Sequence, residues 1–332
     1  MTRKIRRLMK AMTMYDNNIL KDIENAEEIC IAGHINPDGD AVGSVLALAL
    51  YLKRLGKTPR VLLESIPARF AFFGGTQLWY NGAYDGLVPD VFFAVDCGDK
   101  ARLGNAGEVF DRAGLTYCID HHRTNTGFAD VNIINANASS ASEIVFELMK
   151  KNGFDPEKDS EIAADIYSGI VFDTGGFRHN CTGRRTHEIA GMLVDGGVDT
   201  SVIHSRVLFE HTYPQAKLFG IALGNMKHLD GVTYTTLTTA EIEGCGCTSE
   251  DLDGIVDYLL NLDISECAVL VTQRSETAAK ASVRSKKIPI ADIVVSLGGG
   301  GHALAAGVTC DGSAAEVAEK IVALIVKEIK HG

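Results

Sequence analysis

The segment Thr116-Tyr117-Cys118-Ile119-Asp120-His121-His122 decides how we interpret this chain. Its first four residues predict a buried strand, and three side chains able to bind or orient a metal ion follow at once. Two earlier apolar runs, 28–33 and 91–95, end in the same way, in His34-Ile35-Asn36-Pro37-Asp38-Gly39-Asp40 and in Asp96. Short apolar runs of this kind are typical of parallel strands, and ligands bind at the carboxyl ends of such strands. The sequence therefore predicts an α/β fold with a site at one edge of its sheet.

A fourth motif, Asp173-Thr174-Gly175-Gly176-Phe177, follows an apolar run that predicts a buried helix over 161–171. Solvated loop carboxylates and capping histidines would explain any one of the four motifs, but they explain four in series poorly. Two imidazoles and four carboxylates converging on one edge indicate a pair of divalent cations instead. The predicted metal ligands are His34, Asp38, Asp40, Asp96, His121 and Asp173.

The pattern of elements predicts two domains and a connector. Residues 1–26 are an N-terminal lead-in, and residues 27–184 alternate strands with helices, which indicates a doubly wound, mostly parallel sheet. Residues 185–225 are a helical connector, and residues 226–332 form a smaller α/β domain with a mixed sheet. Besides the segments already named, we expect strands over 59–64, 131–134, 231–237, 268–272 and 280–284, and helices over 40–52, 141–150, 289–297 and 314–330.

The composition excludes several classes of protein. With 46% apolar and 23% charged residues among 332, the chain is globular rather than disordered. No apolar run is long enough to span a membrane, and the eight cysteines lack a zinc-type or disulfide spacing, which fits the cytoplasm. The net charge of −11 argues against long duplex nucleic acid as a partner but allows a small anionic one. A homodimer is one alternative for the oligomeric state.

The ligand set indicates phosphoryl chemistry. Mixed oxygen and nitrogen ligands suit Mn²⁺, Mg²⁺ or Fe²⁺ better than a thiolate-preferring zinc ion. Two such ions about 3.5–4 Å apart can clamp a phosphate and lower the pKa of a bridging water, which becomes a hydroxide nucleophile. Neither a P-loop nor a G-x-S-x-G nucleophile motif occurs.

The four motifs together resemble those of the DHH phosphoesterase superfamily. The resemblance implies a Mn²⁺-dependent two-metal phosphohydrolase, in which Asp96 bridges the ions and acts with His122 in catalysis. It also implies that His34, Asp38 and Asp96 hold one ion, and that Asp40, Asp96, His121 and Asp173 hold the other. His122 would contact the scissile phosphate as a donor or general acid. Behind these residues, Asp120 would orient a histidine and Asn125 would steady the loop.

The second domain contains Gly298-Gly299-Gly300-Gly301-His302 before an alanine-rich run that we interpret as a helix. Glycines before a helix leave backbone N–H groups free to hold an anion, and Arg284 could add a bidentate phosphate contact. The run resembles the GGGH motif of the DHHA1 substrate-binding domain. We expect substrate contacts from Arg284, Ser285, Gly299, Gly300, Gly301, His302 and, in the first domain, Arg178.

The absence of sensory and extra nucleic-acid-binding domains makes the chain resemble the bifunctional nano-RNase/pAp phosphatase type. That type implies hydrolysis of short oligoribonucleotides, linear dinucleotides such as pApA and pGpG, and 3′-phosphoadenosine 5′-phosphate. The alternatives are a cyclic-dinucleotide phosphodiesterase, then an inorganic pyrophosphatase, or a nucleotide-binding sensor without catalysis. The pyrophosphatase alternative is weakened because Arg284-Ser285-Lys286-Lys287 departs from the Ser-Arg-Lys-Lys order of those enzymes. We interpret the aromatic residues between 70 and 80 as core packing rather than a base-stacking face.

Overall fold

The fold is taken from a computed structural model that describes residues 18–249 and 251–331, apart from the side chains of Asn18, His302 and His331. The predicted lead-in, residues 1–26, lies outside the described residues as far as residue 17, and helix α2 (Asn18–Asn25) follows. The chain divides into two compact units, Met1–Glu210 and His211–Gly332. This division falls inside the stretch that we predicted to be a connector, so its helices are shared between the units.

The first unit contains a sheet of five strands that pair only in parallel, which confirms the predicted doubly wound α/β class. The strand order is β2-β1-β3-β4-β5. From β1 the chain adds β2 on one side and β3 on the other, and ligands bind at such a switch point in parallel sheets. Side chains of β1 alternate between two cores, with Ile29 and Ile31 on one face and Cys30 and Ala32 on the other. The strands are β1 (Ile29–Ala32), β2 (Arg60–Val61), β3 (Val91–Val95), β4 (Leu115–Asp120) and β5 (Val131–Ile134).

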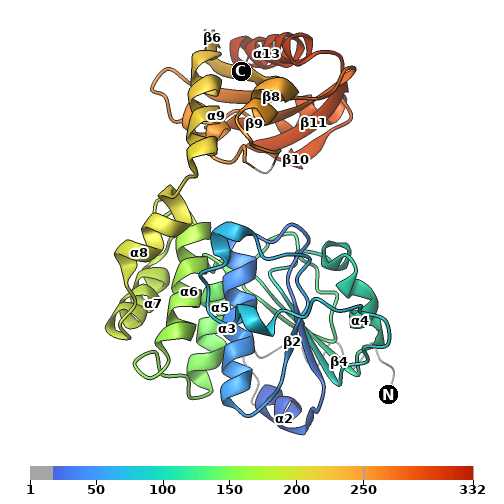
Figure 1. Cartoon of the computed structure of the whole chain (residues 1–332), viewed down its shortest axis with the longest axis vertical. Coiled ribbons are helices and arrows are strands. Elements are labelled where there is room, and N and C mark those ends of the chain that lie inside the picture. Colours follow the sequence, from blue (N-terminus) through green and yellow to red (C-terminus); the bar gives the residue numbers. More distant parts are fainter. Residues whose placement is uncertain (1–17, 250, 332) are drawn as a thin grey trace. The chain divides into compact units, whose positions relative to one another are not determined.

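Helices cover both faces of this sheet (Figure 1). α3, α5 and α6 pack on one face through the larger core, and α4 packs on the other against Phe92. The strand predicted over 59–64 is reduced to two residues, since the chain leaves the sheet after Leu62 donates its N–H to Ile31. The helices of this unit are α3 (Gly39–Arg54), α4 (Ala106–Arg112), α5 (Ala141–Lys151), α6 (Ser160–Asp173), α7 (Arg184–Asp195) and α8 (Thr200–His204), with the 3₁₀ turns η1 (Ala68–Phe70), η2 (Thr76–Leu78) and η3 (Lys100–Leu103) and the π-helical turn η4 (Ser205–Phe209).

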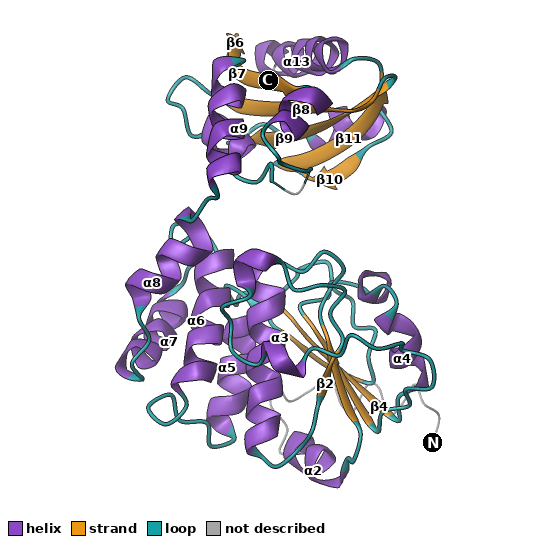
Figure 2. Ribbon diagram, in the orientation of Figure 1, coloured by secondary structure: helices purple, strands orange, loops and turns teal. Residues whose placement is uncertain are grey.

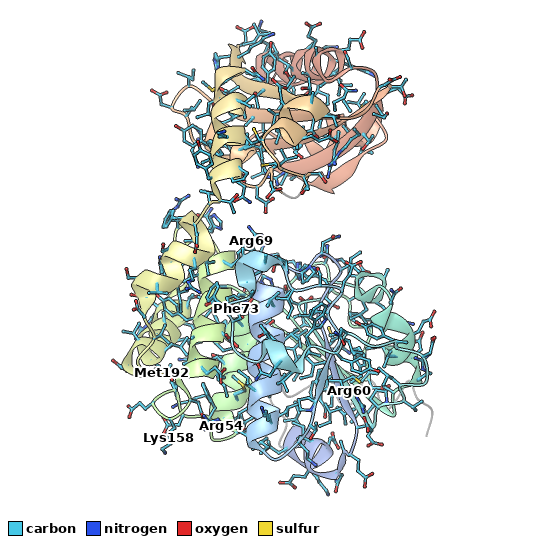
Figure 3. All side chains as sticks on the ribbon, viewed as in Figure 1. Arg54, Arg60, Arg69, Phe73, Lys158 and Met192 are labelled. Carbon is cyan, nitrogen blue, oxygen red and sulfur yellow. The ribbon has the colours of Figure 1, made fainter. Side chains whose placement is uncertain are left out.

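The antiparallel pair α3 and α6 brings the start of one helix beside the end of the other. At the far end, the Arg54 guanidinium forms an ion pair with Asp159, the N-cap of α6, and donates to the carbonyl of Lys158 (Figure 3). One turn into α3, a Cβ on Gly43 would lie 2.6 Å from the carbonyl oxygen of Asp165, so only glycine allows so close an approach. The remaining end therefore places the first turn of α3 next to the last turn of α6.

The second unit contains a mixed sheet of six strands in the order β10-β11-β9-β8-β7-β6. β7 and β8 pair in parallel, and the other neighbours are antiparallel. This confirms the predicted smaller domain with a mixed sheet. The strands are β6 (Lys227–Leu229), β7 (Val232–Leu237), β8 (Cys267–Ser275), β9 (Ala278–Ser285), β10 (Gly300–His302) and β11 (Ala305–Asp311).

Two groups of helices sandwich the second sheet (Figure 2). Strand residues Val269 and Val283 face the core shared with α12 and α13, whereas Ala268 and Leu270 face the core shared with α9, α10 and α11. None of the helices described in the chain has the length and apolar content to cross a membrane. The helices are α9 (Tyr213–Gly224), α10 (Thr239–Gly244), α11 (Ile255–Leu260), α12 (Ala291–Ser296) and α13 (Ala314–His331).

Candidate metal centre

The turn between β1 and α3 provides the first two candidate ligands. The Nδ1 of His34 lies 2.8 Å from the carbonyl oxygen of Ile35 and donates to it, which leaves Nε2 facing the site. Asp38 is the N-cap of α3, and its Oδ1 accepts the backbone N–H groups of Asp40 and Ala41. Its other oxygen, Oδ2, lies 3.7 Å from Nε2 of His34. Each side chain thus uses one atom for local structure and presents one to the site.

Asp40 lies in the first turn of α3 and is completely buried. Its two carboxylate oxygens accept the N–H groups of Ala141 and Ser142, at 2.6 and 3.0 Å, in the first turn of α5. A helix N-terminus has unpaired N–H groups and favours negative charge, so this contact stabilises the carboxylate. It also fixes the carboxylate between the ends of two helices.

Asp96 follows β3 directly and occupies the middle of the site. Its φ of +57° is left-handed, a conformation that costs a residue other than glycine about 1 kcal/mol or more. Its Oδ2 lies 3.5 Å from Nε2 of His34, and its Oδ1 lies 3.5 Å from Nε2 of His121. Oδ1 is buried and has no hydrogen-bond partner among the described residues. A buried carboxylate oxygen with no partner, between two imidazoles, is suited to a cation.

The loop after β4 holds two histidines by different means. His121 points Nε2 at Asp173, whose Oδ2 is 3.2 Å away at the end of α6. His122 donates from Nδ1 to Oδ1 of Asp120, at 2.7 Å. Asp120 is itself fully buried, and its Oδ2 accepts from Nδ2 of Asn125 at 2.7 Å. The chain Asn125–Asp120–His122 therefore sets the orientation of the second ring and leaves its Nε2 uncommitted.

The six predicted ligands come together in the structure. Their atoms form overlapping groups that could each hold a metal ion, every atom within 4.8 Å of the others in its group. One group is His34, Asp38 and Asp96, the set expected for the first ion, and another is Asp40, His121 and Asp173. A third joins Asp96 to His121 and His122, but Asp120 already engages the Nδ1 of His122. Four carboxylates and two imidazoles are donors that Mn²⁺, Mg²⁺ and Fe²⁺ accept, so the residues fit a divalent cation centre.

The electrostatics of these side chains also favour positive charge at the site. Burial and the charge of Asp96 raise the pKa of Asp40 to about 7, and burial and Asp40 raise that of Asp173 well above its usual range. Burial lowers the pKa of His34 and of His121, but the surrounding carboxylates outweigh it and raise both to about 10. Protons on these groups thus offset the negative charge of the carboxylates, which bound cations would also offset.

The predicted substrate contacts are less closely grouped. Arg178 is exposed, and its backbone N–H donates to the carbonyl of Thr174, within the turn that follows Asp173. Arg284 is partly exposed on β9, with Nε 3.6 Å from Oδ1 of Asp257. Ser285 is buried, and its Oγ accepts the N–H of Ile288, which indicates a structural role at the end of β9. The side chain of His302 lies outside the described residues.

The helix predicted after the glycine run is wrong. Gly300–His302 is strand β10, which turns back into β11 and pairs with it, Gly301 opposite Ala306. The alternating burial of Ala305–Val308 suits a strand, and alanine runs alone do not distinguish the two structures. In the described part of the chain, no helix therefore begins at these glycines. Helix α12 ends just before them instead. A Cβ on Gly299 would lie 2.4 Å from the carbonyl oxygen of Gly307, so close packing explains this glycine.

Sequence reasoning overlooked two features near the centre. Gly43 lets α3 approach α6, and Gly169 leaves room for Ser142 of α5 and for the carboxylate of Asp40. An isolated glycine in an apolar helix gave no sign of either contact. Phe177 has a φ of +67° and stacks with His187, although nothing in its residue type predicted that backbone. The aromatic segment behaves as expected: Phe70 and Phe73 are buried and stack in the core, and Nε1 of Trp79 donates to the carbonyl of Leu63.

Two family models match the chain in this order. The DHH family, N-terminal domain, matches residues 28–170, and the DHHA1 domain matches residues 230–331. The first match spans the β1–α3 turn, Asp96 and the two histidines after β4, and the second spans the glycine run. Both of the resemblances that the sequence motifs suggested are therefore found independently.

Relatives and solved structures extend the match to nearly the whole chain. The bifunctional oligoribonuclease and PAP phosphatase NrnA of Thermus thermophilus is 31% identical over 93% of this chain and 92% of its own. The protein of the same description from Bacillus subtilis is 25% identical over 87% and 91%. The crystal structure of an exopolyphosphatase-related protein from Bacteroides fragilis matches with a TM-score of 0.85, 28% identity and 95% and 97% coverage.

Proposed function

Because this chain belongs to the DHH–DHHA1 phosphoesterase family and is a hydrolase of phosphoester bonds, we propose that it hydrolyses short nucleotides with two Mn²⁺ ions. Its substrates are short oligoribonucleotides, linear dinucleotides such as pApA and pGpG, and 3′-phosphoadenosine 5′-phosphate. The observation that carries the proposal is the buried Asp96, whose two oxygens face imidazoles of two different ligand groups. The full-length likeness to an oligoribonuclease and PAP phosphatase supports the choice of substrates.

These groups, together with the family resemblance, support the following ligand sets. His34, Asp38 and Asp96 would hold one ion, and Asp40, His121 and Asp173, together with Asp96, would hold the other. When bound, such a pair of ions neutralises phosphate charge and acidifies a water molecule. The protein fixes the ligands beforehand: Asp38 and Asp40 are tied to helix starts, and His34 is tied to the carbonyl of Ile35. The site therefore needs little reorganisation to bind metal and phosphate.

His122 acts on the phosphate rather than on a metal. Its hydrogen bond to Asp120 and the charge of that carboxylate raise its pKa, so the imidazolium is favoured. With Nδ1 held by Asp120, the second proton is on Nε2, where it can be donated to a phosphate oxygen or to the leaving oxygen. Asn125 contributes by holding Asp120, and it is a positioning residue only.

Substrate contacts in the second unit come from Arg284, Gly300 and His302, with Arg178 contributing from the first. Arg284 offers the planar, permanently charged group that binds phosphate in a bidentate way. Its partner in the free chain, Asp257, is exposed, so a phosphate can replace it at small cost. Ser285 is left out of this set because its side chain is buried.

One assay panel tests the proposal. The purified chain is incubated with Mn²⁺ and, separately, with 3′-phosphoadenosine 5′-phosphate, pGpG, cyclic di-AMP, five-nucleotide RNA, pyrophosphate, longer single-stranded RNA or an RNA duplex. We expect mononucleotide or phosphate from the first, second and fourth, little from a duplex, and a rate that falls as RNA lengthens, because an acidic chain repels longer strands. Turnover of pyrophosphate or cyclic di-AMP alone would contradict the proposed substrates, and activity that persists in a chelator would contradict the metal.

A further inference from the structure

An open groove of about 650 Å³ lies in the first unit, formed by the second half of α6, the turn after it, α8 and η4. Tyr167 and half-buried Phe177 and His204 form its inner wall. Its other lining residues carry hydroxyl groups or stand exposed at the rim: Thr200, Ser201, Ser205 and Phe209. The volume lies within the range of small-molecule sites, and none of these residues belongs to the metal centre.

The inner wall is a stack of planar rings. Phe177 stacks with His187 and with His204, at 5.3 and 6.0 Å between ring centroids and with interplanar angles of 26° and 29°. The hydroxyl of Tyr167 lies 3.3 Å from Nε2 of His204 and fixes that ring. Phe177 keeps this position at the expense of a left-handed backbone, φ +67°, which is uncommon for a bulky residue and recurs at functional sites.

The exposed residues at the rim of the groove contribute little to the hydrophobic core. Phe209 is 66% exposed, although it is large and apolar, and it ends the π-helical turn η4. π-helical turns in proteins often mark functional sites. Ser201 and Ser205 are exposed beside it, so an apolar ring and hydroxyl groups face the same open space. That combination suits a flat, polar heteroaromatic ring better than a lipid chain or an apolar helix.

The groove is connected to the metal centre by short, rigid segments. Tyr167 precedes Asp173 by six residues on α6, which is roughly 9 Å along a helix axis. Phe177 follows Asp173 by four residues, and its N–H donates to Oγ1 of Thr174 at 2.9 Å. A nucleotide whose phosphate lies at Asp173 can therefore reach the groove with its base.

We propose that this groove binds the nucleobase of the substrate, with the ring stacked on the wall formed by Phe177 and His204 and covered by Phe209. The inference rests on the proposed function, because it supplies the base-specific part of a nucleotide site. The hydroxyl groups of Thr200, Ser201 and Ser205 are placed to contact the edge of the base. Because π-faces are common to all bases, the groove should prefer nucleotides over base-free phosphates rather than one base over another.

The experiment compares two substrates in variants of the groove. Phe209→Ala and Phe177→Leu are measured on 3′-phosphoadenosine 5′-phosphate and on its base-free analogue, 1-deoxyribose 3,5-bisphosphate. We expect KM for the nucleotide to rise about five- to fiftyfold, the range of one lost stacking contact, and KM for the analogue to stay within about twofold. Val202→Ala is the matched control, because Val202 is exposed on α8 but does not line the groove.

Each outcome decides. Equal changes on both substrates would mean that Phe209 contacts protein rather than base, and unchanged KM values would mean that the groove is empty during turnover. Either result overturns the inference while leaving the proposed function intact. If the unaltered chain hydrolyses no nucleotide, the proposed function fails instead. Equilibrium binding of adenosine 5′-monophosphate to the unaltered chain and to Phe209→Ala then decides whether the groove binds a base.

Discussion

The two sheets differ in how they support functional side chains. In the first unit, every candidate ligand follows a parallel strand or borders a helix end, and backbone groups hold the carboxylates of Asp38 and Asp40. In the second unit, Arg284 lies within a strand and has one exposed ion pair, and the glycine run forms an edge hairpin. The first arrangement is fixed before a ligand arrives, whereas the second leaves its groups accessible.

The difference agrees with the division of tasks that we propose, in which the first unit binds metal and donates protons and the second recognises phosphate. Metal binding and proton donation need fixed geometry, which buried hydrogen bonds provide. Recognition of phosphates of several nucleotides tolerates looser contacts, because a charged guanidinium binds phosphate without a rigid surrounding. Substitutions in the first unit should therefore lower kcat, and substitutions in the second should raise KM.

The largest effect is expected at the centre of the first unit. Asp96→Asn keeps the size of the side chain and tolerates the left-handed backbone, but it removes the shared charge. We expect activity to fall by at least about a thousandfold while the chain remains folded at the assay temperature. Steady-state kinetics, metal content and thermal unfolding check this. Asp111→Asn, an exposed change of the same kind, is the control. Activity within tenfold of the unaltered chain would show that Asp96 is not a shared ligand.

The next effect concerns pH and metal removal. The folded pKa values of His34 and His121, about 10, lie above the ordinary value of 6.5. Their contribution to stability is therefore complete below pH 6.5 and is lost as the pH rises through 10. The melting temperature in a chelator should fall by about 5 °C or more between pH 7 and pH 10. With Mn²⁺ the fall should be smaller, because metal replaces the protons. Parallel pH profiles with and without the chelator would contradict this.

In the second unit, Arg284→Ala should raise KM for nucleotide substrates about ten- to fiftyfold, since a charge-assisted contact to phosphate is lost. We expect little change in kcat and in metal content. Arg274→Ala, at another exposed arginine of the same sheet, serves as the control. A loss of metal in the Arg284 variant would contradict the division of tasks between the units.

The smallest effects are expected for alanine substitutions in the glycine run, which distinguish a glycine needed for packing from one that contacts substrate. Gly299→Ala introduces a Cβ 2.4 Å from a backbone oxygen, whereas a Cβ on Gly300 meets nothing within 4 Å. We expect the first change to lower the free energy of unfolding by about 2 kcal/mol and the second by less than about 0.5 kcal/mol. Denaturant unfolding measures both. If Gly300→Ala raises KM while stability is unchanged, the backbone at Gly300 contacts substrate. Equal destabilisation would mean that the hairpin packs differently.

The first unit could be predicted further than the second because its motifs follow simple rules. Apolar runs that end in Asp or His are typical of parallel strands with a site at their carboxyl ends, and the ligands around Asp96 do come together. The element boundaries were close there, since α3 and α5 differ from the expected helices by only one or two residues at their ends. The roles of the gathered side chains remain predictions.

The glycine run shows why the rest could not be predicted. Four glycines and three alanines satisfy a helix start and a tight hairpin equally well, and the choice depends on Val308 and Ala306 packing into a core that other elements form. The backbone of Phe177 is a similar case, because its left-handed φ accompanies a ring contact with His187, ten residues further along the chain. Long-range contacts of this kind leave no local pattern in a sequence.

The hydrogen bonds that Asp40 accepts from Ala141 and Ser142 have a consequence for how binding at the site could be followed. These two amide protons are shielded only as long as the carboxylate stays in place at the start of α5. Anything that holds Asp40 more firmly should slow their exchange with deuterated water, and anything that loosens it should speed it. The exchange rate of these two backbone amides, about a hundred residues from Asp40 in the chain, should therefore report whether a ligand is bound at the ends of the strands.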